Sequence, residues 1–409
     1  MDNQIDSAEQ KLTFDEVVEY CKKYYFNLFA RAPVCFEHGD GTALYDMAGK
    51  KYLDFLGGIA VNALGHSNPA ITNAIKTQTD NFIHSTNNYY IEPQARLAKK
   101  LVDISCADRV FICNSGAEAN EAAVKLAKIY QYKAGRHNKY KIVTAIDSFH
   151  GRTLAMVAAT GQTKYQKPYA PLLPGFSHVP LNDIEALNAA VSEEETCAVM
   201  LEVIQGESGV NVADVEYIQA AATLCKERGA LLILDEIQTG LGRTGKLFGY
   251  EHYGVEPDIF TLAKALGAGF PIGAMLAKES VAAAFEPGDH GSTFGGNPLA
   301  CAVGNAAVDL ILKDKLYAAA AEKGAYLMGK FNECKDHCSK ISVVRGKGLM
   351  IAVELNEPVA VQLKEAMFEA GCLVGSVGDK ILRWLPPLTV TYGEMDEAAE
   401  ILGVALDAL

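Results

Sequence analysis

Short apolar runs recur along the middle of the chain, and each is bounded by polar or turn-forming residues. Runs of this kind are typical of strands that are buried on both faces. Between them lie segments with helical periodicity, such as Glu118–Tyr132 and Val215–Glu227. Strands that alternate with helices predict an α/β fold with a mostly parallel sheet covered on both faces. The predicted strands are Val110–Cys113, Lys141–Ala145, Ala198–Ile204, Leu231–Leu234, Ile259–Ala263 and Ile272–Ala277.

The two ends of the chain have different patterns. Near the N-terminus, turns at Gly39–Asp40–Gly41 and Gly49–Lys50–Lys51 separate short alternating segments, which predict a small antiparallel sheet. After Pro298, a long helical region precedes strand-like segments and a final helix, which predict a smaller α+β domain. The predicted division is an N-terminal segment that packs with the C-terminal domain, a large central domain and a small C-terminal domain, at residues 1–67, 68–310 and 311–409.

Composition excludes several classes of protein. The chain of 409 residues has 49% hydrophobic and 21% charged residues, which is typical of a globular protein with a sizeable core. Its net charge of −13 argues against nucleic acid or an anionic membrane as a partner. No apolar run reaches the length of a membrane span, and the acidic, polar first residues do not resemble a secretory signal.

The ten cysteines indicate the redox compartment. Several lie within apolar strand or helix patterns, so we expect free thiols in a reducing cytoplasm rather than disulfides. Cys334 and Cys338, with His337 between them, resemble half of a zinc site, but no second pair of ligands has a suitable spacing. We therefore expect a cytoplasmic protein without a bound metal.

Two of the predicted strands end at a charged residue. Asp235 follows Leu231–Leu234, and Lys264 follows Ile259–Ala263. The carboxyl ends of strands in an open α/β sheet form the ligand crevice, so the acid and the amine are expected to face one crevice. A lysine there can form a Schiff base, and an aspartate can hold the pyridinium nitrogen of pyridoxal phosphate. An ordinary ion pair between the two side chains is the alternative.

Two loops that follow earlier strands suit a charged ligand. Small residues at Asn114–Asn120 open a helix whose free N–H groups can bind an anion, although Ser115 as a plain helix cap is the alternative. The loop Ser148–Thr153 supplies an aromatic ring and Arg152, whose planar fork suits a carboxylate. The alternative for this loop is a surface turn with a routine arginine.

Two later segments add carboxylates and hydroxyls. Glu202 and Glu207 follow a strand and invite an arginine partner, for which Arg383 is the candidate; solvated turn charges are the alternative. The segment His290–Pro298 places hydroxyls and glycines before a helix, which suits another phosphate contact. A glycine-rich linker is the alternative for that segment.

Taken together and in this order, these motifs resemble those of the class III aminotransferases, the acetylornithine and ornithine aminotransferase family. The resemblance extends from Phe29 to about Pro387 and is strongest to the acetylornithine branch. It implies a fold-type I pyridoxal phosphate enzyme, with a mostly parallel seven-stranded sheet in the large domain. The motifs that carry it are FLGGIAVNALGH, NSGAEANEAAVKLA, FHGRTLA, LLILDEIQTGLGRTG, TLAKALG and GDHGSTFGGNPLACA.

The resemblance implies roles for individual residues. Lys264 carries the cofactor as a Schiff base and moves the proton, and Asp235 keeps the pyridine nitrogen protonated. Arg152 binds a substrate carboxylate. Arg383 binds the α-carboxylate of glutamate, and Glu207 masks Arg383 while an ω-amine is the donor. Further implied contacts are Ser115, Gly116, Ala117 and the partner subunit's Thr293 at the phosphate, Phe149, Glu236, Ile237 and Gln238 around the ring, and Ser292 beside the substrate.

The implied enzyme is a homodimer with shared active sites. It moves the δ-amino group of N-acetylornithine to 2-oxoglutarate, giving N-acetylglutamate 5-semialdehyde and glutamate in arginine biosynthesis. Alternatives on this scaffold are aminotransferases for succinylornithine, ornithine, 4-aminobutyrate or an acyl-lysine compound, and a pyridoxal phosphate mutase or racemase. Three residues depart from the family pattern. Ser208 stands where glycine is common, and Phe29 and Ile59 stand where ornithine aminotransferases carry tyrosine, which argues against free ornithine.

Overall fold

A sheet of seven strands forms the centre of the computed structural model, which describes residues 11–409. The strand order is β4-β12-β11-β10-β7-β5-β6, and the pairings from β11 to β6 are all parallel. In the described chain, β12 alone runs antiparallel to its neighbours in this sheet, which confirms the mostly parallel architecture. The strands are β4 (Arg109–Cys113), β5 (Lys141–Ala145), β6 (Phe176–Val179), β7 (Thr196–Leu201), β10 (Leu231–Asp235), β11 (Ile259–Leu262) and β12 (Gly273–Ala277).

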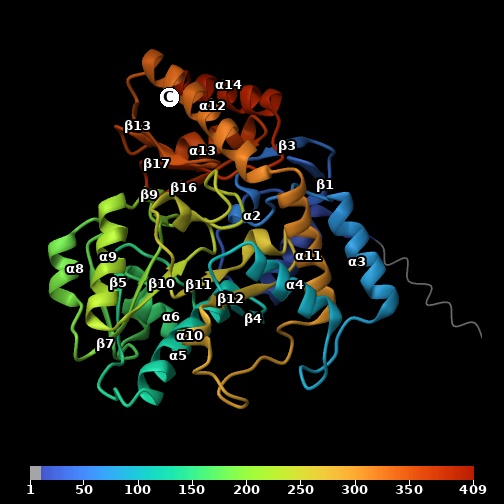
Figure 1. Ribbon diagram of the computed structural model, residues 1–409. Coiled ribbons are helices and arrows are strands. Elements are labelled where there is room, and N and C mark those ends of the chain that lie inside the picture. Colours follow the sequence, from blue (N-terminus) through green and yellow to red (C-terminus); the bar gives the residue numbers. More distant parts are fainter. Residues whose placement is uncertain (1–10) are drawn as a thin grey trace, which may run out of the picture.

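Helices pack on both faces of this sheet, and Figure 1 shows them around the strands. Leu231 and Ile233 of β10 point into the core beneath α5, whereas Leu232 and Leu234 point into the core beneath α9. Every position of β10 is buried, which explains why its first four residues, Leu231–Leu234, are all apolar. The helices of this region are α5 (Gly116–Lys133), α6 (Leu154–Ala159), α7 (Thr163–Gln166), α8 (Ile184–Ala190), α9 (Val215–Arg228) and α10 (Glu279–Ala282), with 3-10 turns η1 (Lys167–Tyr169), η2 (Gly249–His252) and η3 (Lys264–Leu266).

Two details of the large sheet differ from the predicted strands. The edge strand β6 was not predicted, because Ser177 and His178 interrupt its short apolar pattern. The run that was predicted to end at Ile204 leaves the sheet after Leu201, and the chain then forms the hairpin of β8 (Ile204–Gln205) and β9 (Asn211–Val212). Glu202 therefore stands directly at the carboxyl end of β7.

The C-terminal region forms a separate four-stranded antiparallel sheet, in the order β13-β14-β17-β16. In Figure 1 its orange and red elements lie above the large sheet. The long helical region before it is divided at Lys315, whose φ of +48° ends one helix axis and starts another. The elements are α11 (Pro298–Lys313), α12 (Leu316–His337), β13 (Ile341–Lys347), β14 (Met350–Leu355), α13 (Ala360–Glu369), β15 (Cys372–Leu373), β16 (Gly375–Val377), β17 (Ile381–Trp384) and α14 (Tyr392–Asp407).

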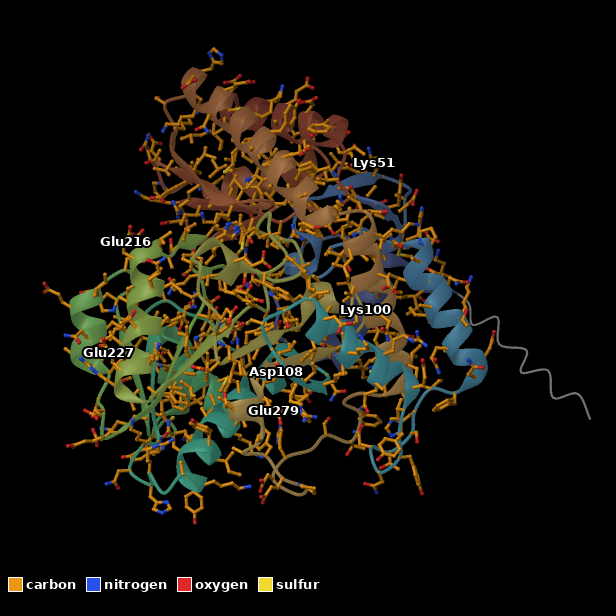
Figure 2. All side chains as sticks on the ribbon, in the orientation of Figure 1. Lys51, Lys100, Asp108, Glu216, Glu227 and Glu279 are labelled. Carbon is orange, nitrogen blue, oxygen red and sulfur yellow. The ribbon has the colours of Figure 1, made fainter. Side chains whose placement is uncertain are left out.

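The N-terminal sheet is completed by a strand from the far end of the chain. Strands β1, β2 and β3 are antiparallel, and β15 adds to β3 in parallel, with Cys372 opposite Leu53. Figure 2 shows Lys51 of β3 at this junction, where it forms an ion pair with Glu397 of α14 at 3.5 Å. The N-terminal elements are α1 (Phe14–Tyr24), β1 (Phe36–Asp40), β2 (Ala43–Asp46), β3 (Lys51–Asp54), α2 (Gly57–Ala60), α3 (Pro69–Asn81) and α4 (Glu92–Asp103).

The predicted division at residues 67 and 310 stays a prediction. Its first segment includes residues 1–10, which lie outside the described chain. Its second boundary, after residue 310, cuts α11 before the helix ends at Lys313. A division between α11 and α12, at Lys315, agrees better with the secondary structure.

A buried arginine connects the loop after β10 with the C-terminal sheet. Arg243 donates from Nη1 to the carbonyl oxygen of Leu349, at 3.0 Å, and to that of Pro386. Leu349 precedes β14 and Pro386 follows β17, and the two strands are antiparallel, so one guanidinium holds both strands of the sheet's central pair at the same end. The side chain is fully buried, and burial lowers the pKa of Arg243 to about 10.

The ten cysteines are all free thiols. Cys334 and Cys338 lie at the end of α12 and are partly buried. Among residues 11–409, no cluster of three or more His, Cys, Asp or Glu side chains is arranged to hold a metal ion. The same residues contain no helix with the length and apolar character that a membrane span needs.

Candidate active site

A cavity of about 460 Å³ opens where β10 and β11 end, and both Asp235 and Lys264 line it. The two strands are parallel, and Asp235 lies opposite Thr261, shortly before Lys264. This is the carboxyl edge of the sheet, where open α/β folds bind ligands. The predicted site residues that line the cavity are Ser115, Gly116, Ala117, Phe149, Arg152, Asp235, Ile237, Gln238 and Lys264.

Asp235 accepts three hydrogen bonds. Its Oδ2 accepts from Nδ2 of Asn120 and from Nδ1 of His150, each at 2.8 Å, and its Oδ1 accepts from the N–H of Ile237 at 3.1 Å. Thr261 donates from Oγ1 to Oδ1 of Asn120 at 2.8 Å, which turns the amide so that its NH₂ group faces the carboxylate. Several donors around a buried carboxyl group stabilise its ionised form.

Lys264 begins the turn η3 directly after β11, with a φ of +41°. Residues other than glycine rarely adopt this left-handed backbone conformation, so the strain makes Lys264 a candidate functional position. Within residues 11–409, its Nζ has no hydrogen-bond or ion-pair partner. Desolvation lowers the pKa of Lys264 to about 8, although Glu207 acts in the opposite direction. Near neutral pH, a larger fraction of this amine is therefore unprotonated than of an ordinary lysine, and the unprotonated form acts as nucleophile or base.

The first turn of α5 closes one end of the cavity. Ser115 is the N-cap of this 18-residue helix, and its Oγ accepts from the N–H of Glu118 at 3.2 Å. Ser115, Gly116 and Ala117 all line the cavity, so the role of Ser115 as a helix cap does not remove it from the cavity. A Cβ atom on Gly116 would lie 2.7 Å from Cδ1 of Ile237, so a larger residue here would displace the Ile237 side chain at the cavity wall. Free N–H groups at the start of a helix suit a phosphate.

Arg152 rests on two aromatic rings at the mouth of the cavity. Its guanidinium carbon lies 4.0 Å from the ring centroid of Tyr165 and 5.5 Å from that of Phe149. Tyr165 comes from the short helix α7, and its ring meets Phe149 edge to face. Cation–π contacts of this kind orient a guanidinium while its N–H groups stay free for a carboxylate.

Arg383 is already paired with Glu207. Its Nη1 donates to Oε1 of Glu207 at 2.8 Å and to the carbonyl oxygen of Gly206 at 2.7 Å. Gln238 donates from Nε2 to the same Glu207 oxygen at 3.2 Å. Burial acts to raise the pKa of Glu207, but the charges of Arg383 and Lys264 outweigh it and the pKa is lowered. Gln238 lines the cavity, so it connects this ion pair with the space beside Lys264.

Five predicted residues are not among the described residues that line the cavity: Glu207, Arg383, Ser292, Thr293 and Glu236. Glu207 and Arg383 lie behind Gln238. Ser292 accepts at Oγ from Nδ2 of Asn114, at 3.1 Å, and Thr293 is exposed. A single chain therefore does not bring Thr293 to its own cavity.

Glu236, also predicted to contact the cofactor, faces away from the cavity. Its carboxyl oxygens accept from the N–H groups of Gly249, at 2.9 Å, and Tyr250, at 2.7 Å, and from the hydroxyl of Thr239. Burial raises the pKa of Glu236 to about 7. Its contacts fix the loop after β10 rather than a ligand.

Several polar residues around the site were not assigned to it from the sequence. His150 and Asn120 lie within motifs that were recognised, but their contact with Asp235 depends on the packing of α5 against the sheet. Glu202 lines the cavity and accepts at Oε2 from the N–H of Phe149 at 2.9 Å. All three residues are polar and lie within motifs that were recognised, and polar residues that are buried need partners, which is the signal in the sequence that could have assigned them to the site.

The chemistry of the cavity fits pyridoxal phosphate. Asp235 suits a pyridinium nitrogen, the amine of Lys264 suits an aldehyde, and the start of α5 suits a phosphate. Oε1 of Gln238 is buried and has no partner within residues 11–409, which leaves an acceptor to be satisfied beside the cavity.

Similar proteins were found by sequence. A family model of the class III aminotransferases matches residues 27–406. The acetylornithine aminotransferase of Caldanaerobacter subterraneus subsp. tengcongensis is 50% identical over 393 residues, which cover 96% of this chain and 100% of that protein. The acetylornithine aminotransferase of Methanocaldococcus jannaschii is 49% identical over 379 residues, which cover 92% of this chain and 94% of that protein.

Solved structures agree with the sequence relatives. The ornithine aminotransferase of Toxoplasma gondii has a TM-score of 0.93 and 31% identity, and the match covers 98% of this chain and 96% of that one. The acetylornithine aminotransferase of Elizabethkingia anophelis has a TM-score of 0.88 and 32% identity, covering 98% of this chain and 100% of that one. With a family match over residues 27–406 and a lysine, an aspartate and a helix start gathered at one cavity, this chain belongs to the class III aminotransferases, which are pyridoxal phosphate-dependent enzymes.

Proposed function

We propose that this enzyme transfers the δ-amino group of N2-acetyl-L-ornithine to 2-oxoglutarate, giving N-acetyl-L-glutamate 5-semialdehyde and L-glutamate, in arginine biosynthesis. Relatives of 49% and 50% identity that bear the name acetylornithine aminotransferase support it. The observation that carries the proposal is the unequal state of two arginines. Arg152 is open at the cavity, whereas Arg383 is held by Glu207 at 2.8 Å.

This inequality suits two substrates of different shape. N-acetylornithine reacts at its δ-amine and presents its carboxylate at the far end, within the proposed reach of Arg152. Glutamate reacts at its α-amine and presents one carboxylate far from the reacting carbon and another next to it. Arg383 serves this second carboxylate. Beside the uncharged chain of N-acetylornithine, an unpaired Arg383 would be a desolvated cation, which is energetically unfavourable. Glu207 removes this penalty by pairing with Arg383.

The chain's own residues divide the chemistry. Pyridoxal phosphate, when bound, supplies an electron sink and a carrier for the amino group. Nζ of Lys264 would hold it covalently and move a proton at the substrate carbon that bears the amine. Asp235 would keep the pyridine nitrogen protonated, because an adjacent anion favours the charged form. Ser115, Gly116 and Ala117 would hold the phosphate, Phe149 and Ile237 would flank the ring, and Gln238 would contact its 3-oxygen.

A cytoplasmic homodimer with shared active sites completes the proposal. Thr293 is exposed beside Phe294, whose side chain is 63% exposed, and Phe29 and Tyr90 are also exposed. Exposed apolar side chains of this size support an interface with a second copy. The partner's Thr293 would then reach the phosphate. Ten free thiols support a reducing compartment.

A panel of amino donors tests the proposal. The purified enzyme is given 2-oxoglutarate with N-acetylornithine, N-succinylornithine, ornithine, 4-aminobutyrate or an N-acyl-lysine compound, and glutamate formation is measured. We expect the highest kcat/KM with N-acetylornithine. A higher value for any other donor would replace the proposed substrate. Conversion of a single donor without 2-oxoglutarate would instead indicate a mutase or racemase.

A further inference from the structure

Two carboxyl groups stand next to each other at the ends of neighbouring parallel strands. Leu201 of β7 lies opposite Leu234 of β10, and the residues that follow them are Glu202 and Asp235. Both side chains line the cavity and are almost fully buried, with 5% exposure for Glu202 and 4% for Asp235. Two neighbouring carboxylates that are buried from solvent repel each other, so they do not both ionise readily.

Their hydrogen bonds decide which of the two carries the charge. Asp235 accepts from His150, Asn120 and the main chain of Ile237. Glu202 accepts one hydrogen bond, from the N–H of Phe149 at 2.9 Å, and within residues 11–409 it has no ion-pair partner. A carboxylate gains stability from each donor it accepts. The network therefore favours the anion at Asp235 and the neutral acid at Glu202.

We propose that Glu202 is a positioning residue that stands in the cavity as a neutral carboxylic acid, where it anchors the main chain of Phe149 and leaves Asp235 as the carboxylate of the pair. The inference rests on the proposed function, because Phe149 and Asp235 are the residues assigned to the ring.

The charged neighbours of Glu202 agree with this assignment. Burial first, and then the charge of Asp235, raise the pKa of Glu202 well above its ordinary value, and Glu207 acts in the same direction. The Phe149 N–H and the charge of Lys264 oppose this rise without cancelling it. Because Glu202 is neutral, it does not add a negative charge that would hold a proton on Lys264.

Infrared spectroscopy of the apoenzyme tests the protonation state without any turnover. A glutamine at this position can accept from the Phe149 N–H and donate with its NH₂ group, so E202Q mimics the neutral acid. At neutral pH, the difference spectrum of wild type minus E202Q should contain the C=O band of a protonated carboxyl group. Carboxylate bands in place of that signal would overturn the proposal.

The stability of the apoenzyme supplies a second readout. A carboxyl group with a raised pKa in the folded state keeps its proton while the unfolded chain releases it, so the stability of the fold decreases as the pH rises. E202Q has no proton to retain. The melting temperature of E202Q minus that of wild type should therefore increase as the pH rises from about 5 to about 8. A difference that does not change with pH would contradict a neutral Glu202.

The positioning role is tested by adding pyridoxal phosphate to the apoenzymes. E202A loses the anchor of Phe149, so its affinity for the cofactor should fall about tenfold. E202Q should rescue that affinity, and the pH midpoint of its cofactor absorbance should coincide with that of wild type. A midpoint in E202Q that differs from that of wild type would show that the substitution removes a charge and that Glu202 is an anion. If wild type forms no absorbing complex, the proposed function fails, while the infrared result still decides the state of Glu202.

Discussion

His150 donates from Nδ1 to Oδ2 of Asp235 across 2.8 Å, in a position where both side chains are buried. Because an ionised carboxylate is only an acceptor, this contact fixes the tautomer of His150 with its proton on Nδ1. The aspartate that would face the ring nitrogen is therefore held by a second layer of polar residues, His150 and Asn120.

Replacing Asp235 with asparagine should weaken cofactor binding and slow the half-reactions of both amino donors. The amide has one acceptor oxygen and places an NH₂ group against His150 and Asn120, which are themselves donors. We expect a loss of ~1.5–3 kcal/mol in cofactor affinity, measured by fluorescence titration. H150Q serves as the matched control and should lose less, since Asp235 keeps its charge. Wild-type half-reaction rates in D235N would make Asp235 purely structural.

Uptake of pyridoxal phosphate by the apoenzyme should accelerate as the pH rises through about 8, the value to which burial lowers the pKa of Lys264. The free amine, not the ammonium ion, attacks an aldehyde, so the protonated fraction below this pH does not react. Stopped-flow absorbance against pH gives the midpoint. A midpoint near the ordinary lysine value of 10.5 would contradict the described environment.

Lys264→Ala should bind the cofactor without a covalent link and lose most of its turnover, because no other amine is assigned to the proton transfer. Borohydride should trap the cofactor on wild-type Lys264, and mass spectrometry of the peptides locates the adduct. K278A is a control, because Lys278 directly follows the end of β12 and does not line the cavity, and this variant should turn over as wild type does. Near-normal turnover in K264A would refute the assignment.

The pairing of Glu207 with Arg383 predicts opposite effects on the two half-reactions. Glu207→Ala leaves Arg383 unpaired and should slow the reaction with N-acetylornithine more than that with glutamate. Arg383→Ala should do the reverse, and Arg152→Ala should impair both, by ~1.5–3 kcal/mol for one charged contact. Single-turnover absorbance with each donor measures this. Equal losses for both donors in E207A and in R383A would show that no switch exists.

Mixed dimers test whether Thr293 serves the partner's site. Chains with Lys264→Ala are mixed with chains with Thr293→Ala, and hybrids are isolated by means of two affinity tags. If Thr293 acts across the interface, each hybrid has one site with both defects and one intact site, so activity is regained. If Thr293 acts within its own chain, both sites are defective and mixing restores nothing. An active monomer would also exclude the shared site.

Arg243→Met should destabilise the fold by ~2–4 kcal/mol, because the buried carbonyls of Leu349 and Pro386 lose their donor. Chemical denaturation measures the free energy of unfolding. R243K retains one charged donor and should lose less. A variant as stable as wild type would show that the contact with the C-terminal sheet contributes nothing to stability.

The sequence was sufficient for the features that depend on local pattern. The apolar runs predicted six of the seven strands of the large sheet, all except β6, and the charges that end two of them predicted that Asp235 and Lys264 meet at one cavity. These inferences need only the alternation of strands with helices, which brings the carboxyl ends of parallel strands to one edge.

Features that depend on long-range packing were not predictable. Tyr165 lies beneath Arg152 because α7 returns to the cavity, and its surroundings in sequence carry no motif. The position of Glu236, by contrast, could have been predicted from the sequence. Consecutive residues of a strand point to opposite faces, so a cavity-facing Asp235 already requires that Glu236 face the other way.

The pairing of β15 with β3 also sets an order of events during protein synthesis. The outer edge of β3 has no neighbour until Cys372 and Leu373, which are made long after β3, have left the ribosome. Until then, the nascent chain carries an open strand edge of the kind that pairs wrongly with other chains. A ribosome that stalls before residue 372 would therefore release a polypeptide with an unfinished sheet, and such fragments are expected to require chaperones or to be degraded.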